Sequence, residues 1–283
     1  MIGCTKCFIP RYFRSSAFNI PVVRLHGAIM DSTSLMARML SLSRCADLLD
    51  KAFSDKRAPA VALVINSPGG SPVQSRLIFQ RIRDLADEKK KQVLVFVEDV
   101  AASGGYMIAC AGDEIFADAT SIVGSIGVVS ASFGFPELLK KIGVERRIYT
   151  AGKNKVILDP FQPEKKTGID HLKSLQLEVH QTFIDLVKER RESKLSDDPD
   201  IFTGMFWTGK RGIGLGLIDG LGDVRSVVKE RFGDKTKLRL ISPSKSLLGP
   251  KTPSGISADV VNMAVDSVLT VAEERALWQR YGL

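Results

Sequence analysis

Two glycine-containing segments combine residue types that can attack a carbonyl carbon and bind its oxygen. A P-G-G sequence contains Gly69 and Gly70, and an A-S-G-G-Y sequence contains Ser103 and Gly104. Glycine has no Cβ atom, so backbone N–H groups of the first segment can approach a substrate oxygen closely. Ser103 lies among small residues, with the Gly104 N–H beside it as a second donor. Two converging donors form an oxyanion hole, worth about 3 to 4 kcal/mol per donor, so the two segments predict acyl transfer with Ser103 as nucleophile.

A serine nucleophile needs a base, and the three histidines of the chain are poor candidates. His26 ends an expected strand, whereas His171 and His180 belong to a long charged helix in which a solvated histidine is the usual case. Lysine is the remaining type of base. A lysine with an ordinary pKa of about 10.4 is neutral in well under 1% of molecules at pH 7, so its site must be buried and free of carboxylates.

The middle of the chain alternates short β-branched runs with stretches of helical periodicity, which is typical of a mostly parallel sheet between helices. The predicted fold class is therefore α/β. The two glycine segments follow strands expected at 61–65 and 93–97, and ligands collect at such strand ends. Further strands are expected at 21–25, 114–117, 127–130 and 145–149, and apolar helical faces at 35–53, 73–85, 163–191 and 258–279.

Three motifs together resemble the signal peptide peptidase A and SohB family of serine peptidases. They are N-S-P-G-G-S from Asn66, A-A-S-G-G-Y from Ala101 and G-S-I-G-V from Gly124. The resemblance extends over roughly residues 20–230. It implies a Clp-protease and crotonase-like fold of repeated ββα units, hydrolysis of peptide bonds, and assembly into a homo-oligomeric ring.

The resemblance also implies roles for single residues. By motif, Ser103 matches the nucleophile, Lys155 the general base, and Ser125 a serine that hydrogen-bonds the lysine amine. Lys153 is the alternative base, because it lies in the same A-G-K-N-K segment. Clp proteases instead use a histidine in the stretch after their serine, where this sequence has none before His171. In related proteins the serine and the lysine can come from adjacent subunits, so the resemblance implies a dyad completed across a subunit interface.

The uncharged stretch 119–136 is as long as a membrane span but too rich in glycine and serine for a lipid-facing helix. It is expected to line a groove for extended peptides with small or apolar side chains, such as signal peptides or unfolded segments. The expected organisation is a basic and aromatic segment at 1–19, a peptidase domain at 20–240, and a linker with a helix at 241–283.

Composition limits the partners and the location of this chain of 283 residues, which is 44% hydrophobic and 25% charged, as in ordinary globular proteins. Its net charge of +8 suits an anionic surface, but the mixed-sign charge clusters are typical of solvated helix ends, and nucleic acid is not expected as a partner. Cys4 and Cys7 form a C-x-x-C without a second pair, so neither a metal nor another cofactor is expected. No export signal is evident, which favours the cytoplasm, with peripheral membrane contact through residues 1–19 as the alternative to a frayed terminus.

Two other functions compete with the peptidase interpretation. A crotonase-type acyl-CoA enzyme would share the fold and the paired backbone donors but would use no serine nucleophile, so Ser103 discriminates against it. A catalytically silent, membrane-associated scaffold would retain the N-terminal segment and the last helix without needing the catalytic motifs. The presence of all the motif residues favours the peptidase.

Overall fold

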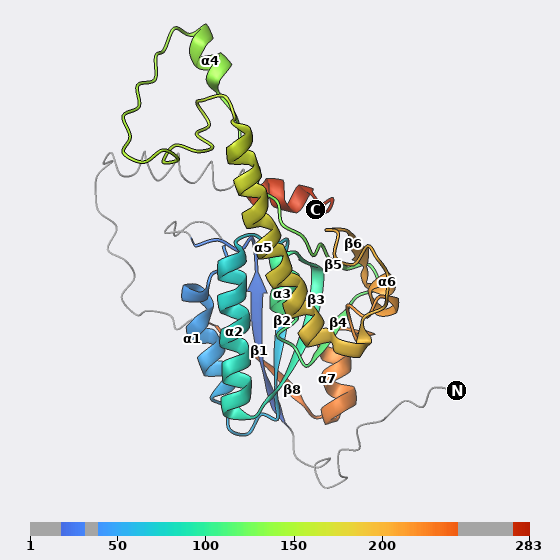
Figure 1. Cartoon of the computed structure of the whole chain (residues 1–283). Helices are drawn as coiled ribbons and strands as arrows, with labels where there is room; N and C mark the ends of the chain where they lie inside the picture. The colour runs from blue at the N-terminus through green and yellow to red at the C-terminus, as the bar shows by residue number, and fades with distance from the viewer. Residues whose placement is uncertain (1–17, 32–38, 243–273) are drawn as a thin grey trace, which may run out of the picture.

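The chain folds around a mostly parallel β-sheet, seen in the computed structural model of residues 18–31, 39–242 and 274–283 (Figure 1). The strands run across the sheet in the order β6-β5-β3-β2-β1-β8, and β4 pairs with both β3 and β7. All of these pairs are parallel except β5 with β6. The strands are β1 (Asn19–His26), β2 (Ala60–Ser67), β3 (Gln92–Ala102), β4 (Glu114–Ala117), β5 (Ile122–Gly124), β6 (Phe206–Thr208), β7 (Gly220–Leu221) and β8 (Lys237–Leu240).

Helices flank this sheet, with α1, α2, α3 and the root of α5 on one face and α7 on the other (Figure 1). The helices are α1 (Leu42–Phe53), α2 (Pro72–Lys89), α3 (Gly104–Ala109), α4 (Pro136–Lys141), α5 (Lys166–Arg191), α6 (Gly209–Gly214) and α7 (Val224–Phe232), with a 3-10 turn η2 (Glu192–Lys194) after α5. Residues 274–279 form a short helix near the far end of the chain. None of the helices in the described ranges has both the length and the apolar character that crossing a bilayer requires.

Two apolar cores lie on opposite faces of the sheet, because successive side chains of a strand point to opposite sides. Within β2, Val61, Leu63 and Ile65 face the core under α1 and α2, whereas the alternate residues Ala62 and Val64 face α7. All eight residues of β2 are buried, as expected for a central strand covered on both faces. The predicted α/β class is confirmed.

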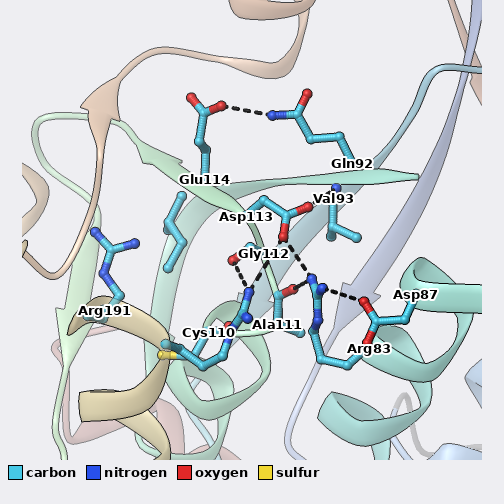
Figure 2. Close-up of polar contacts among 12 residues, drawn as sticks. Arg83, Asp87, Gln92, Val93, Cys110, Ala111, Gly112, Asp113, Glu114 and Arg191 are labelled. Atoms are coloured by element: carbon cyan, nitrogen blue, oxygen red, sulfur yellow. Dashed lines mark hydrogen bonds and ion pairs between the residues drawn. The ribbon is translucent and has the colours of Figure 1, made fainter. Parts of the chain in front are cut away.

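A polar network fixes the loop after α3 to two helices that come from distant parts of the sequence. Arg83 of α2 donates to the Ala111 carbonyl at 3.0 Å and pairs with Asp113 at 2.9 Å, as Figure 2 shows. Arg190, at the end of α5, donates to the carbonyl oxygens of Cys110 and Gly112 at 2.9 and 3.1 Å. Helix α3 therefore has a firmly held carboxyl end opposite the turn at which it begins.

Residues 127–165, which we call the arm, lie between β5 and α5 and stand away from the sheet (Figure 1), whereas Ser125 and Ile126 before them are buried. The strands predicted at 127–130 and 145–149 lie here, and both predictions are wrong, because these residues have no neighbouring strand with which to form a ladder. Apolar side chains of the arm face solvent, with Phe133 80% and Tyr149 91% exposed.

The remaining predicted elements agree with the structure to within a few residues where it describes them. The strands at 21–25, 61–65, 93–97 and 114–117 are present, and β3 continues through the A-A that precedes Ser103. The helix predicted at 163–191 begins at Lys166. Four predicted parts lie wholly or mainly outside the described residues. They are the first residues of the helical face expected at 35–53, most of the N-terminal segment at 1–19, the linker after 242 and most of the helix expected at 258–279.

Candidate active site

Ser103 forms the sharp turn between β3, which ends at Ala102, and α3, which begins at Gly104. Its backbone has φ 52° and ψ −121°, a conformation that L-residues rarely adopt. The Ser103 N–H is held by the Gly124 carbonyl oxygen at 2.9 Å, so the turn is fixed from β5. A strained strand-to-helix turn of this kind presents a serine hydroxyl at the end of a sheet, which is how several hydrolases expose a nucleophile.

Gly69 and Gly70 lie directly beside this turn, on the loop that leaves β2. A Cβ atom at Gly69, where φ is +98°, would lie 2.8 Å from Ser103 Cβ and 2.9 Å from Gly104 N. At Gly70, where φ is +140°, a Cβ would lie 2.2 Å from the Ile29 carbonyl oxygen. Only glycine fits at either position, and the fit brings the two glycine segments of the sequence together.

The backbone donors around Ser103 differ in whether they are already used. The Gly69 N–H donates to Ser67 Oγ at 3.3 Å. The N–H groups of Gly70 and Gly104, by contrast, have no acceptor among the described residues. Gly70 and Gly104 therefore each have an N–H that is free to bind a substrate oxygen, and the lack of a Cβ at Gly69 lets the two segments lie close together.

Further contacts behind the Ser103 turn hold β2, β3 and the start of α3 together. Asn66 Oδ1 accepts the Val100 N–H at 3.2 Å, across a bulge in the pairing of β2 with β3. Gly105 packs so closely that a Cβ there would lie 2.5 Å from the Ser67 carbonyl oxygen. Tyr106, which is fully buried, donates to the Leu217 carbonyl at 2.7 Å. The first turn of α3 is therefore anchored to both β2 and the segment before β7.

A buried ion pair joins the root of α5 to the same segment. Arg191, 1% exposed, donates to the Gly216 carbonyl at 2.8 Å and to both carboxylate oxygens of Asp219 at 2.8 and 3.2 Å. Burial by itself would raise the pKa of Asp219, but the hydrogen bonds and charge of Arg191, helped by Lys194, hold that pKa below its usual range. Burial raises the pKa of the neighbouring Cys110 thiol to about 12. This cysteine is consequently a core residue and a poor nucleophile.

Ser125 lies next to the residue that holds Ser103, at the point where β5 runs into the arm. Its backbone is left-handed, with φ 54°, and its N–H donates to the Met205 carbonyl at 2.7 Å. The hydroxyl of Tyr281 donates to Ser125 Oγ at 3.1 Å, and this contact is buried. No local sequence pattern predicts this role of Tyr281, because the tyrosine lies 156 residues from its partner.

Lys155 and Lys153 are placed on the exposed arm and not beside Ser103 of the same chain. The residues after Lys155 pack on the first turn of α5, where a Cβ at Gly168 would lie 2.9 Å from Ile157 Cγ1. His180 Nε2, farther along α5, lies 3.0 Å from the carbonyl oxygen of Ile126, the residue after Ser125. Twelve residues of helix separate these two contacts, which corresponds to about 18 Å along the axis.

Other groups near the predicted base and nucleophile have partners of their own. Asp159 pairs with Arg146 at 3.2 Å within the arm. The His26 ring packs against Trp278, with centroids 5.8 Å apart, and in the described part of the chain no histidine hydrogen-bonds Ser103. The described residues also contain no group of three or more side chains suited to a metal ion. Residues 119–122, from the stretch expected to line a groove, border a hollow of about 790 Å³ whose lining does not include Ser103.

The site thus combines a serine on a strained strand-to-helix turn with neighbouring backbone N–H groups that have no described acceptor, an arrangement that serine hydrolases use. Comparison with known proteins agrees, because the model of peptidase family S49 matches residues 86–236. This chain belongs to peptidase family S49, and its resemblance to the signal peptide peptidase A and SohB proteins is confirmed.

Several relatives show how widely this region occurs. A Brucella abortus protein named Na(+)/H(+) antiporter NhaA is 65% identical over 99% of this chain and 39% of its own length. A putative protease of Methanocaldococcus jannaschii is 35% identical over 65% of this chain and 58% of its own length. The chloroplastic serine protease SPPA of Arabidopsis thaliana is 31% identical over 86% of this chain and 37% of its own length. The chain therefore spans less than two thirds of the length of each of these relatives.

Proposed function

We propose that this chain is a serine endopeptidase in which Ser103 is the nucleophile and Lys155 of a second copy is the general base. The lysine takes the Ser103 proton as Oγ bonds to the peptide carbonyl carbon, and the N–H groups of Gly70 and Gly104 bind the oxyanion. The lysine then gives its proton to the departing amine. A water molecule, deprotonated by the same lysine, cleaves the acyl-enzyme and restores the Ser103 hydroxyl.

One observation carries this proposal: a strained serine turn has two unused backbone donors beside it. The φ of 52° at Ser103 is maintained by the Gly124 carbonyl and by close packing against Gly69. Strain that the surrounding structure maintains is typical of functional sites. An acyl-CoA enzyme without a nucleophile would have no use for this conformation at Ser103.

The position of Lys155 supports a base that comes from another copy of the chain. Within one chain Lys155 belongs to the arm, a segment that stands beyond the amino end of α5 and away from the sheet (Figure 1). The same arm exposes large apolar side chains, including Phe133 and Tyr149, that would be costly to leave in water. A neighbouring copy would cover these side chains and receive Lys155 beside its own Ser103 and Ser125, in a closed ring of identical contacts.

For substrates we propose extended peptides with small or apolar side chains, including cleaved signal peptides and other membrane-derived segments. The net charge of +8 and the relatives named as Na(+)/H(+) antiporters, which match this chain over 39% of their length, support action beside an anionic membrane surface. Comparing hydrolysis of a signal peptide with that of a charged peptide of equal length would test the preference.

The mechanism is tested by labelling and cleavage assays on matched variants. A fluorophosphonate probe should label the parent protein but not Ser103→Ala, and both Ser103→Ala and Lys155→Ala should lose signal-peptide and casein cleavage. Lys153→Ala tests the alternative base, and Lys173→Ala, an exposed lysine on α5, serves as the control that keeps activity. Undiminished cleavage by Ser103→Ala would refute the proposed nucleophile.

A further inference from the structure

The segment 274–283 packs against the strand ends that carry the candidate site, although it lies outside the region that matches the family model. Trp278 and Tyr281 join an apolar cluster that includes Ala102, the residue before the nucleophile. The Tyr281 ring also packs edge-on against Phe206, with centroids 5.1 Å apart. These contacts leave Tyr281 only 9% exposed and fix the position of its hydroxyl.

That hydroxyl has a single described partner, and the partner belongs to the site. Tyr281 Oη donates to Ser125 Oγ at 3.1 Å in a buried contact. Among the described residues, no acceptor is found for the Ser125 hydroxyl proton. The backbone next to Ser125 holds the nucleophile, since the Gly124 carbonyl accepts the Ser103 N–H at 2.9 Å. Tyr281 therefore hydrogen-bonds the side chain of Ser125, the residue directly after Gly124, whose carbonyl oxygen holds the Ser103 N–H.

We propose that Tyr281 is a positioning residue for the lysine base and that it acts through Ser125. The inference rests on the proposed function, in which Lys155 of a neighbouring copy reaches Ser125. A serine hydroxyl has one proton and two acceptor lone pairs. Because Tyr281 donates to Ser125 Oγ, it occupies one lone pair and leaves the Ser125 proton to point at another acceptor. A neutral lysine amine is such an acceptor, whereas an ammonium group has only donors.

This arrangement favours the neutral base over its charged form. Hydrogen bonds in a chain polarise one another, so the donation from Tyr281 makes Ser125 a stronger donor to the amine and a weaker acceptor from an ammonium. Burial of the site acts in the same direction, because an ammonium loses its water there. The lysine can then accept the Ser103 proton at a lower pH than it otherwise would.

The test is Tyr281→Phe, which keeps the ring and its packing on Phe206 and removes only the hydroxyl. In the assembled protein, we expect kcat for signal-peptide cleavage to fall about tenfold, the effect of losing one hydrogen bond to the site. The acidic limb of the kcat profile should move to higher pH, with KM unchanged and the thermal unfolding midpoint lowered by no more than about 4 °C. Ser125→Ala should have the same effect, and adding Tyr281→Phe to it should cost nothing more. Gln279→Ala, an exposed change on the same segment, is the control that retains activity.

Other outcomes would overturn the inference. A rise in kcat for Tyr281→Phe would mean that the tyrosine blocks Ser125 from the lysine and acts as a latch. Unchanged kcat, or a fall without a shift of the acidic limb, would leave Tyr281 a packing residue only. These results concern Tyr281 alone as long as the parent shows cleavage that Ser103→Ala abolishes; if the parent lacks such cleavage, the proposed function fails and the inference fails with it.

Discussion

Replacing Asp219 by Asn should reveal how strongly the buried ion pair stabilises the root of α5. The substitution keeps the shape of the side chain but leaves the Arg191 guanidinium, 1% exposed, without a counter-charge. Breaking a buried pair by neutralising one partner costs about 3 kcal/mol or more, because the remaining charge is uncompensated. The amide NH2 of asparagine cannot accept, so the hydrogen bonds that Arg191 or Lys194 makes to one of the two carboxylate oxygens are lost as well.

The pH dependence of this loss follows from the pKa of Asp219, which the folded protein holds below its usual range. A carboxyl group with a lowered folded pKa contributes stability above its unfolded pKa of about 3.9, and the contribution disappears as the pH falls through the folded value. The parent and Asp219→Asn should therefore differ most near pH 7, and the difference should shrink as the pH falls below about 3.9 toward the lowered folded pKa.

Urea unfolding curves at a series of pH values, at one protein concentration, measure the difference. Glu145→Gln is the control, since its pair with Arg147 is largely exposed, and it should change the free energy of unfolding by less than about 0.5 kcal/mol. A difference for Asp219→Asn that is below about 1 kcal/mol at pH 7, or that does not vary with pH, would refute the role assigned to this pair.

Three further changes test other parts of the structure. Gly70→Ala should lower kcat at least about 100-fold, because its Cβ would meet a backbone carbonyl and displace an oxyanion donor. Gly233→Ala, also at a positive φ but with open space around it, should keep activity, and equal activity of both variants would contradict the assignment. Burial raises the pKa values of Cys45 and Cys110 to about 12, so in a variant with Cys4→Ser and Cys7→Ser they should react with a disulfide reagent at pH 8 only after unfolding. Fast reaction of this variant in its native state would contradict their burial. Tyr149→Asp should shift the assembly toward single chains in analytical ultracentrifugation, and an unchanged sedimentation profile would argue against an interface there.

Parts of the candidate site can be predicted from the sequence because they depend on residues that are close together in it. Gly69, Gly70 and Ser103 lie on short loops at strand ends, so the roles proposed for them follow from residue types within a few positions, and in the structure Gly69 packs directly against Ser103. Likewise, β2 and β3 are long apolar runs that need no partner information to be recognised as buried strands.

Other features depend on contacts that no local pattern records. The stretch at 145–149 has the composition of a strand, but a strand needs a neighbour, and the arm stands apart from the sheet. Tyr281 meets Ser125 only because the chain returns to the site after 156 residues. In the proposed mechanism Lys155 meets Ser103 only through a contact between two copies, which neither its sequence motif nor the fold of one copy records.

Mixing two inactive variants tests the central claim, a dyad shared between copies, most directly. Ser103→Ala retains the lysine and Lys155→Ala retains the serine, so a ring assembled from both contains interfaces with one intact serine and one intact lysine. Random assembly of an equal mixture should restore about one quarter of the parent activity, since each partner is correct half of the time. A mixture that co-assembles yet stays as inactive as its components would contradict the shared dyad.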